Sequence, residues 1–243
     1  MRPLSAHEII SLWEWGQRRQ APEQALELLA VTYPEATWEE LSSLTIGRRD
    51  ARLLALRELT MGSLLQGFAC CPQCGEQIEF TIETGDLLMG EGDPGSEHEL
   101  EGEEYRLRFR MPNSLDLLAA AGCADAPGAA RELRRRCVVA ARRNDDPVNP
   151  ETLPESVVAS LAERMEDLDP MTELRLRLNC LKCRHRWSIL LDIATFFLRE
   201  ISVLARHLAL EVHTLARAYG WHEADILAMS PARRGLYLET AAR

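Results

Sequence analysis

Hydrophobic residues recur at helical spacing over most of the chain and alternate with polar residues in a few short segments. The longest helical pattern is 193–219, where apolar residues every three or four positions define one wide face. A second strong helix is predicted at 48–61, with Gly62 as its stop signal. Alternation at period two predicts strands at 76–83 and 104–111, and again between 173 and 191.

These patterns predict an α+β protein, mainly α, in which helical N- and C-terminal parts surround a small antiparallel β element. The predicted regions are an N-terminal helical region (1–66), a discontinuous β region (67–112 with 173–192), a helical insertion (113–172) and a C-terminal helical region (193–243). We expect them to form one integrated unit. Helices predicted within the insertion are 115–121, 129–143 and 155–166, and the acidic, glycine-rich segment 90–99 is interpreted as a solvated hairpin tip rather than a binding loop.

Two cysteine pairs lie within the predicted β region. Cys71 and Cys74 form one C-x₂-C motif, and Cys180 and Cys183 form the other. Four thiolates in this pattern are the ligand set of a structural Zn²⁺ site, with Zn–S distances of about 2.3 Å. Pairs of a zinc ribbon usually lie about 15–20 residues apart. The long interval here predicts that one zinc ion joins two remote parts of the chain.

Other readings of the cysteines are weaker. A dithiol redox site needs one C-x-x-C beside a βαβ pattern, which leaves the second pair unexplained. Disulfides are disfavoured because the chain has seven cysteines and no export signal. Cys70 in place of Cys71, or His185 in place of Cys183, breaks the paired spacing. Four protein ligands leave no open position, so the site is expected to be structural rather than catalytic.

Composition and charge narrow the function further. The formal net charge is −10 over 243 residues, which argues against general nucleic-acid binding. No stretch of 18 apolar residues exists, so no membrane-spanning helix is predicted. The first residues lack the apolar core of a signal peptide, and synthesis in the cytoplasm is therefore expected. Catalytic motifs such as a P-loop or H-E-x-x-H are missing from the sequence, so an enzyme is not predicted.

Two clusters of basic residues leave a nucleic-acid alternative open. One lies in the insertion and one surrounds the second cysteine pair: Arg131, Arg134, Arg135, Arg136, Arg142 and Arg143, and then Arg175, Arg177, Lys182, Arg184 and Arg186. A zinc-ribbon nucleic-acid or transcription-associated adaptor is the alternative function. Contact with proteins is favoured, because the chain is acidic, stacking aromatics are scarce and arginine is common at protein interfaces.

Two stretches of the chain, each with a short motif that follows it, resemble a known family. The first is 44–57 (Leu-Thr-Ile-Gly-Arg-Arg-Asp-Ala-Arg-Leu-Leu-Ala-Leu-Arg), which is followed by Cys71-Pro-Gln-Cys-Gly. The other is 216–227 (Ala-Arg-Ala-Tyr-Gly-Trp-His-Glu-Ala-Asp-Ile-Leu), followed by Ser-Pro-Ala-Arg-Arg at 230–234. In this order they resemble the T4-type bacteriophage baseplate protein family, which includes members from contractile injection systems.

The resemblance implies a non-enzymatic, zinc-stabilised structural or assembly protein that acts by protein–protein contact in a contractile tail or injection-system baseplate. Its partners would be baseplate or spike-hub proteins, with no small-molecule substrate and no membrane insertion. A protein of this kind is made in the cytoplasm and incorporated into, or used to assemble, a phage-like particle. The arginine and tryptophan residues of the two motifs are the expected partner contacts: Arg48, Arg49, Trp221, Arg233 and Arg234.

Overall fold

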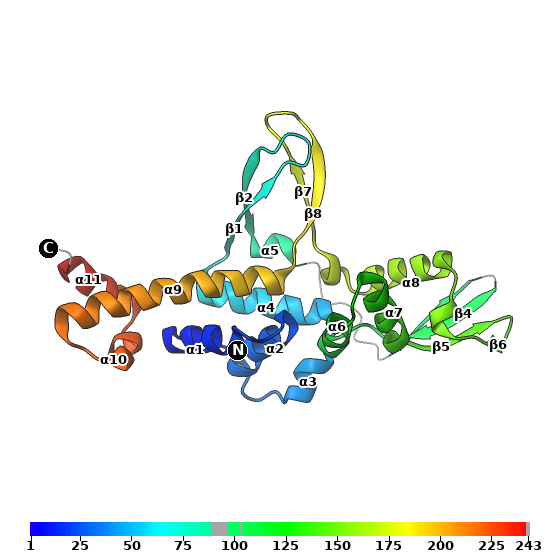
Figure 1. Ribbon diagram of the computed structural model, residues 1–243, viewed down its shortest axis with the longest axis horizontal. Helices are drawn as coiled ribbons and strands as arrows, with labels where there is room; N and C mark the ends of the chain where they lie inside the picture. Colours follow the sequence, from blue (N-terminus) through cyan, green and yellow to red (C-terminus); the bar gives the residue numbers. More distant parts are fainter. Residues whose placement is uncertain (89–96, 103, 242–243) are drawn as a thin grey trace.

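The computed structural model describes residues 1–88, 97–102 and 104–241, and it has an elongated shape (Figure 1). Its body consists of helices from both ends of the chain packed around the long helix α9 (Ile193–Tyr219). The other helices of this body and of the C-terminal end are α1 (Ala6–Gly16), α2 (Ala21–Thr32), α3 (Trp38–Ser43), α4 (Ile46–Met61), α10 (Glu223–Ala228) and α11 (Pro231–Ala241). Segments nearly 200 residues apart in sequence therefore share one core.

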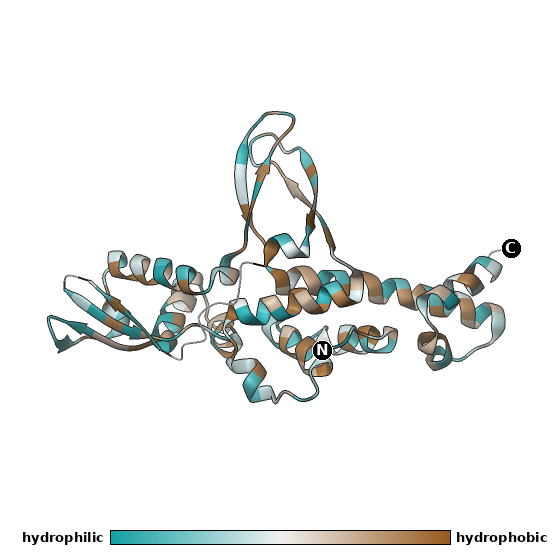
Figure 2. Ribbon diagram, turned by 180° about the vertical axis from the view of Figure 1, so that it is seen from behind, coloured by the Kyte–Doolittle hydropathy of each residue, from teal (hydrophilic) through white to brown (hydrophobic). Residues whose placement is uncertain are grey.

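Local signals set the ends of these helices. The side chain of Asp192 accepts a hydrogen bond from the Thr195 N–H at the start of α9, and Gly220 ends α9 in the left-handed conformation. One face of α9 supplies core residues at three- and four-residue intervals, including Phe197, Ile201 and Leu208. Hydrophobic residues gather in the helices of this body (Figure 2). Among the described residues, no helix is both long and apolar enough to cross a bilayer.

Two β-hairpins rise side by side from the middle of this body (Figure 1). The first pairs β1 (Leu64–Cys70) with β2 (Gln77–Glu83), and the second pairs β7 (Arg175–Asn179) with β8 (Arg186–Leu190). Each is a separate two-stranded antiparallel sheet. The short helix α5 (Thr84–Leu87) and the 3₁₀ helix η2 (Pro170–Glu173) lie at their base.

The segment between the hairpins forms a second, smaller unit at one end of the molecule. Its sheet has the order β3 (His98–Glu101), β4 (Tyr105–Phe109), β5 (Val138–Arg143), β6 (Asp146–Pro147). The helical elements with it are α6 (Ser114–Ala121), α7 (Ala126–Cys137), the 3₁₀ helix η1 (Pro150–Thr152) and α8 (Glu155–Leu168). Sheet and helices enclose their own core, in which Leu107, Phe109 and Val138 meet Leu161 of α8.

The predicted fold class is confirmed: the protein is mainly helical with small antiparallel sheets. Three details differ from the prediction. The first hairpin begins at Leu64 rather than 67. The strand predicted at 104–111 pairs with β5 and not with the cysteine hairpins, and the helix predicted at 129–143 ends at Cys137. Backbone pairing explains both later differences, because the valine-rich segment after Cys137 finds a partner strand in β4. Residues 90–96 of the predicted acidic tip lie outside the described residues.

Candidate metal centre

The four predicted cysteine ligands lie in the loops at the tips of the two hairpins. In the first hairpin the last paired residues are Cys70 and Gln77, so the loop comprises 71–76. In the second they are Asn179 and Arg186, so the loop comprises 180–185. Each loop thus begins with the first cysteine of its C-x₂-C pair. We call these loops the two knuckles.

The two knuckles have the same backbone hydrogen bonds. In the first, the Cys71 N–H donates to the Glu76 carbonyl (2.8 Å) and the Gly75 N–H donates to the Cys71 carbonyl (2.9 Å). In the second, the Cys180 N–H donates to the His185 carbonyl (2.8 Å) and the Arg184 N–H donates to the Cys180 carbonyl (2.8 Å). Equivalent turns at the two tips therefore present equivalent pairs of sulfur atoms.

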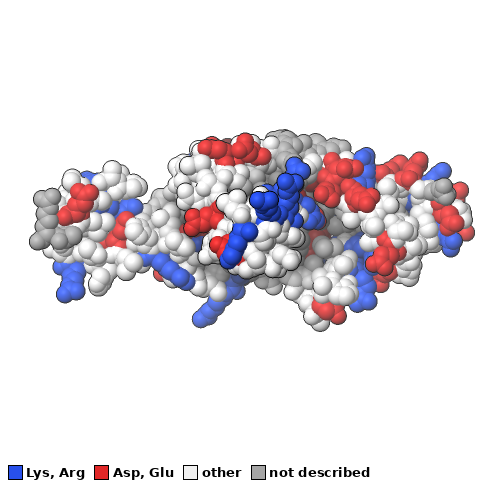
Figure 3. Space-filling model, turned by 90° about the horizontal axis from the view of Figure 1, so that it is seen from above, with Lys and Arg blue, Asp and Glu red and all other residues white. Residues whose placement is uncertain are grey.

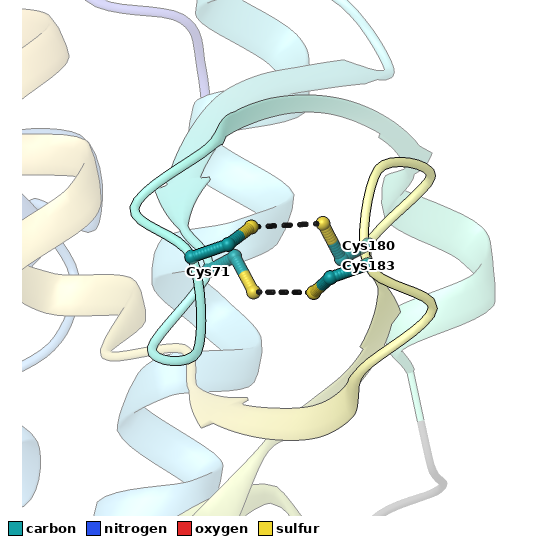
Figure 4. A group of neighbouring side chains, drawn as sticks. Cys71, Cys180 and Cys183 are labelled. Carbon is teal, nitrogen blue, oxygen red and sulfur yellow. Dashed lines mark hydrogen bonds between the residues drawn. The ribbon is translucent and has the colours of Figure 1, made fainter.

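The sulfur atoms converge between the tips (Figure 4). The Sγ atoms of Cys71 and Cys183 are 3.6 Å apart, as are those of Cys74 and Cys180, and all four lie within 4.8 Å of one another. Sulfurs at the corners of a tetrahedron around zinc are about 3.8 Å apart when Zn–S is about 2.3 Å. A disulfide requires about 2.05 Å. The spacing therefore suits four ligands of one metal ion, and each hairpin contributes two of them.

Each knuckle contributes one buried and one exposed ligand. Cys71 and Cys180, the first cysteine of each pair, are buried, whereas Cys74 and Cys183 lie at the surface of the tip. The Cys183 N–H, which points at the Cys180 sulfur, lowers the pKa of the Cys180 thiol to about 7. At Cys74 the Glu76 N–H acts in the same direction, but partial desolvation of the sulfur and its contacts with the other three thiols outweigh it and raise the pKa of Cys74 to about 12. Thiols packed this closely lose their protons when a cation replaces them, so metal affinity falls at low pH.

Neither Cys70 nor His185, the possible substitutes for Cys71 and Cys183, belongs to the cluster of ligand atoms. Cys70 is the last residue of β1. Its side chain is exposed, and its sulfur is not part of the cluster. The imidazole of His185 stacks on Trp187, with ring centroids 5.9 Å apart. Cys137 is buried with its sulfur 4.0 Å from the Asp116 carboxylate, and burial raises the pKa of its thiol to about 12, which makes it an inert thiol.

One ion pair reinforces the contact between the knuckles. The Lys182 ammonium lies 2.7 Å from a Glu76 carboxylate oxygen, and both side chains are exposed. Because water screens an ion pair between exposed side chains, this contact is secondary to the cysteines. The sequence alone gave no sign of it, since residue spacing does not reveal which side chains of the two tips meet.

The hairpins share no backbone hydrogen-bonded pairing with each other. Isolated two-stranded hairpins are marginally stable in water. Their inward residues, such as Ile78 and Leu178, are only partly buried and provide little core of their own. A metal ion at the tips would therefore fix the position of one hairpin against the other.

A comparison with known families agrees with this geometry. A family model described as T4 bacteriophage base plate protein matches residues 17–198, three quarters of the chain. The chain belongs to this family. The match includes both knuckles and the segment 44–57, and it confirms the resemblance inferred from the sequence. No curated protein and no solved structure matches the chain.

The motif at 44–57 has a structural role in this base plate protein. Thr45 caps α4, and the Gly47 N–H donates to the buried carboxylate of Asp169 (3.1 Å). The backbone at Gly47 approaches that carboxylate so closely that a Cβ would clash with it. Buried Arg49 binds Asp50 (2.7 Å) and donates to the Ser114 hydroxyl (3.3 Å). The motif therefore joins α4 to both the start of α6 and the end of α8.

The motif near the C-terminus folds the end of the base plate protein back on itself. Buried Arg234 binds Glu211 of α9 (2.7 Å) and donates to the Met229 carbonyl (2.7 Å). Trp221 stacks on Tyr219 with ring centroids 4.5 Å apart, and Tyr237 contacts both rings edge-on. These contacts hold α10 and α11 against the end of α9.

The five expected partner contacts thus lie in different settings and at two separate places. Arg49 and Arg234 are buried and bind partners within the chain. Arg48 and Trp221 are partly exposed, and Arg233 is exposed. Trp221, Arg233 and Arg234 lie beyond residue 198, where the family match ends. A role in partner contact stays a prediction. Of the five residues, Arg48, Trp221 and Arg233 have side-chain surface that a partner could reach.

The two clusters of basic residues lie in different parts of the structure and have different contacts. In the insertion, Arg136 and Arg110 both bind the buried carboxylate of Asp116, and Arg135 binds Glu132. These arginines stabilise the smaller unit. Around the second knuckle, Arg175 and Arg177 of β7 and Arg186 of β8 have exposed side chains, and a basic cluster is visible where the hairpins point toward the viewer (Figure 3).

Proposed function

We propose that this base plate protein is a non-enzymatic structural or assembly component of a phage-like contractile tail or injection-system baseplate. One Zn²⁺ ion, bound by Cys71, Cys74, Cys180 and Cys183, is its structural cofactor. The observation that carries the proposal is the convergence of these four sulfurs, within 4.8 Å, from segments more than 100 residues apart in a member of the base plate family. A metal ion with four protein ligands has no open position for a substrate, and it stabilises the structure instead.

The geometry supports action through surfaces rather than through a reaction centre. The paired hairpins project from the helical body, and α9 extends to the opposite end from the smaller unit (Figure 1). Such a shape can contact several neighbours at once while the metal keeps one contact element rigid. We infer that these neighbours are baseplate or spike-hub proteins. Synthesis in the cytoplasm, followed by incorporation into or assembly of a particle, completes the proposal.

Complementation of a deletion strain tests this function. Wild-type protein is expected to restore particle assembly and to co-purify with baseplate or hub proteins. Cys71→Ser is expected to do neither, whereas Cys70→Ser, which alters the exposed neighbouring cysteine, is expected to behave as wild type. Normal particles in the deletion strain, with no baseplate protein retained by the purified chain, would refute the proposal.

The same purified protein tests the nucleic-acid alternative. The exposed basic residues of β7 and β8 give that alternative its physical basis. Binding to DNA or RNA that weakens steeply as salt rises, together with dispensability for particle assembly, would favour it. The net charge of −10 argues for the opposite result.

A further inference from the structure

The solvent face of α9 carries a continuous stripe of basic and aliphatic side chains. Its members recur at alternating spacings of four and three residues, which places them on one side of the helix, opposite the buried face. All of them are exposed. The residues of this α9 stripe are Arg199, Val203, Arg206, Leu210, His213 and Arg217.

Two large aliphatic residues stand out in the stripe. Val203 is 68% exposed and Leu210 is 66% exposed, and they are seven residues apart on the same face. Their exposure is not shared by the apolar residues on the other side of α9, such as Phe197 and Leu208, which are buried. Aliphatic side chains at this spacing are the anchors with which one amphipathic helix contacts another.

The charge of the stripe opposes that of the chain. Arg199, Arg206 and Arg217 form no ion pair with any other described residue. The carboxylates of α9, Glu200 and Glu211, lie outside the stripe and bind Arg57 and Arg234. A chain with a net charge of −10 thus has a helix face without a carboxylate. Figure 3 shows basic side chains projecting at intervals along the edge of the end that contains α9.

We propose that the α9 stripe is the docking site for an acidic amphipathic helix of a neighbouring protein in the particle. The inference rests on the proposed function and specifies the chemistry of one partner. Charge complementarity selects the occupant: carboxylates would lie opposite Arg199, Arg206 and Arg217, and apolar residues opposite Val203 and Leu210. From 199 to 217 the stripe is about 27 Å long, so the docked helix has about 20 residues.

A fluorescent synthetic peptide of about 20 residues tests the proposal with the full chain. The peptide carries leucines at four- and three-residue spacing flanked by glutamates, and its counterpart has lysines in place of the glutamates. Fluorescence anisotropy is expected to show binding of the acidic peptide that weakens with salt, and no comparable binding of the lysine peptide. The double variant Arg206→Glu/Arg217→Glu is expected to bind the acidic peptide about tenfold or more weakly.

A matched control separates the stripe from charge in general. Arg164 is exposed on α8, far from the stripe in sequence and in Figure 1, and Arg164→Glu is expected to leave peptide binding unchanged. All the substituted residues are exposed, so thermal unfolding of each variant is expected to match that of wild type. Photo-cross-linking from position 203 in assembled particles is expected to label an acidic helical segment of a neighbour, and charge reversal at Arg206 is expected to abolish the label.

Four results would overturn the docking site. Equal binding of both peptides, or of neither, would remove the charge complementarity on which the inference depends. Dimers of the chain alone in sedimentation velocity, abolished by Val203→Glu, would assign the stripe to a second copy. Stripe-dependent binding to phosphatidylglycerol vesicles without peptide binding would assign it to a lipid surface. If stripe variants still restore particles while Cys71→Ser does not, the docking site fails and the proposed function stands.

Discussion

Gly75 and Arg184 occupy equivalent positions in the two knuckles, each following the second cysteine of its pair and each with a positive φ, of 73° and 62°. Only glycine adopts this conformation without a steric cost, which for other residues is about 1–2 kcal/mol. We expect Arg184→Gly to stabilise the second hairpin by about 1 kcal/mol and Gly75→Ala to destabilise the first by a similar amount. Thermal unfolding in zinc-containing buffer measures both changes.

Arg177→Gly is the matched control for that pair of substitutions. It removes the same side chain from a regular strand position in β7, where glycine is expected to cost about 0.5–1 kcal/mol. Stabilisation by Arg184→Gly and destabilisation by Arg177→Gly would together locate the effect in the backbone conformation. Equal effects at both positions would show that the Arg184 backbone carries no strain.

The contact between Gly47 and Asp169 predicts a strongly coupled pair of substitutions. A methyl group at Gly47 would overlap the Asp169 carboxylate, so Gly47→Ala is expected to destabilise the protein by about 1–3 kcal/mol. In an Asp169→Ala background the same change is expected to cost much less, because the overlapping atoms are gone. A double-mutant cycle by urea unfolding measures the coupling, and additive effects would contradict the close approach.

Arg57 ties the first hairpin to the helical body, and its loss is expected to be costly. Its buried guanidinium binds Glu200 of α9 (2.8 Å) and donates to the carbonyls of Gly62 and Leu64, just before and at the start of β1. Arg57→Met leaves these acceptors unpaired, and we expect a loss of about 3 kcal/mol in the free energy of unfolding. Arg52→Met on the same helix, which loses a contact with the Tyr33 ring, is expected to cost clearly less. Equal losses would exclude a special role for Arg57.

The buried carboxyl group of Asp50 is expected to make the stability of the protein depend on pH, in a pH range above that in which ordinary carboxyl groups titrate. Burial raises the pKa of Asp50 to about 6, partly opposed by the Arg49 guanidinium and assisted by the carboxylates of Asp192 and Asp169. The unfolded chain titrates near 3.9, so the folded state holds the proton more tightly. This contribution to stability is full below about pH 4 and is lost as pH rises to about 6.

Carbon NMR of the Asp50 carboxyl group measures this titration directly. A midpoint near 6 is expected, and Asp50→Asn is expected to remove the matching loss of stability between about pH 4 and pH 6 in urea unfolding. A midpoint near 4, or the same pH slope in the variant, would contradict the assignment.

The sequence predicted those features that depend on local spacing. The helix expected at 193–219 spans those residues in the structure, because its apolar face recurs without interruption. The cysteines of the two knuckles were expected to meet because C-x₂-C pairs share a metal ion, whatever the length of chain between them. In both cases the signal lies within the segment itself.

Features that depend on a distant partner were missed. Residues 138–143 were predicted as the end of a helix, but Val138 pairs with Phe109 and the segment becomes β5. Neither residue reveals the other through periodicity. The motif arginines Arg49 and Arg234 were expected at a partner surface, but both are buried and bind carboxylates of the same chain, those of Asp50 and Glu211. An arginine beside Asp50 in an apolar helix is a signal that could have indicated an internal pair.

The metal is expected to stabilise the hairpins more than the body. The buried core formed by α2, α4 and α9 lies below the tips and contains none of the four cysteines. Removal of zinc by a chelator is therefore expected to raise hydrogen exchange in β1, β2, β7 and β8, while α9 stays protected and the helical circular dichroism is largely kept. Uniform loss of protection throughout the chain would show instead that the metal holds the whole fold together.

Native mass spectrometry of the purified protein is the decisive test of the Zn²⁺ site formed by the two knuckles. We expect one zinc ion per chain, retained by Cys70→Ser and lost in Cys71→Ser and Cys183→Ser, with all four ligand cysteines in the reduced form. A wild-type chain that carries no metal when prepared with zinc, or whose mass shows the four cysteines joined as disulfides, would contradict it.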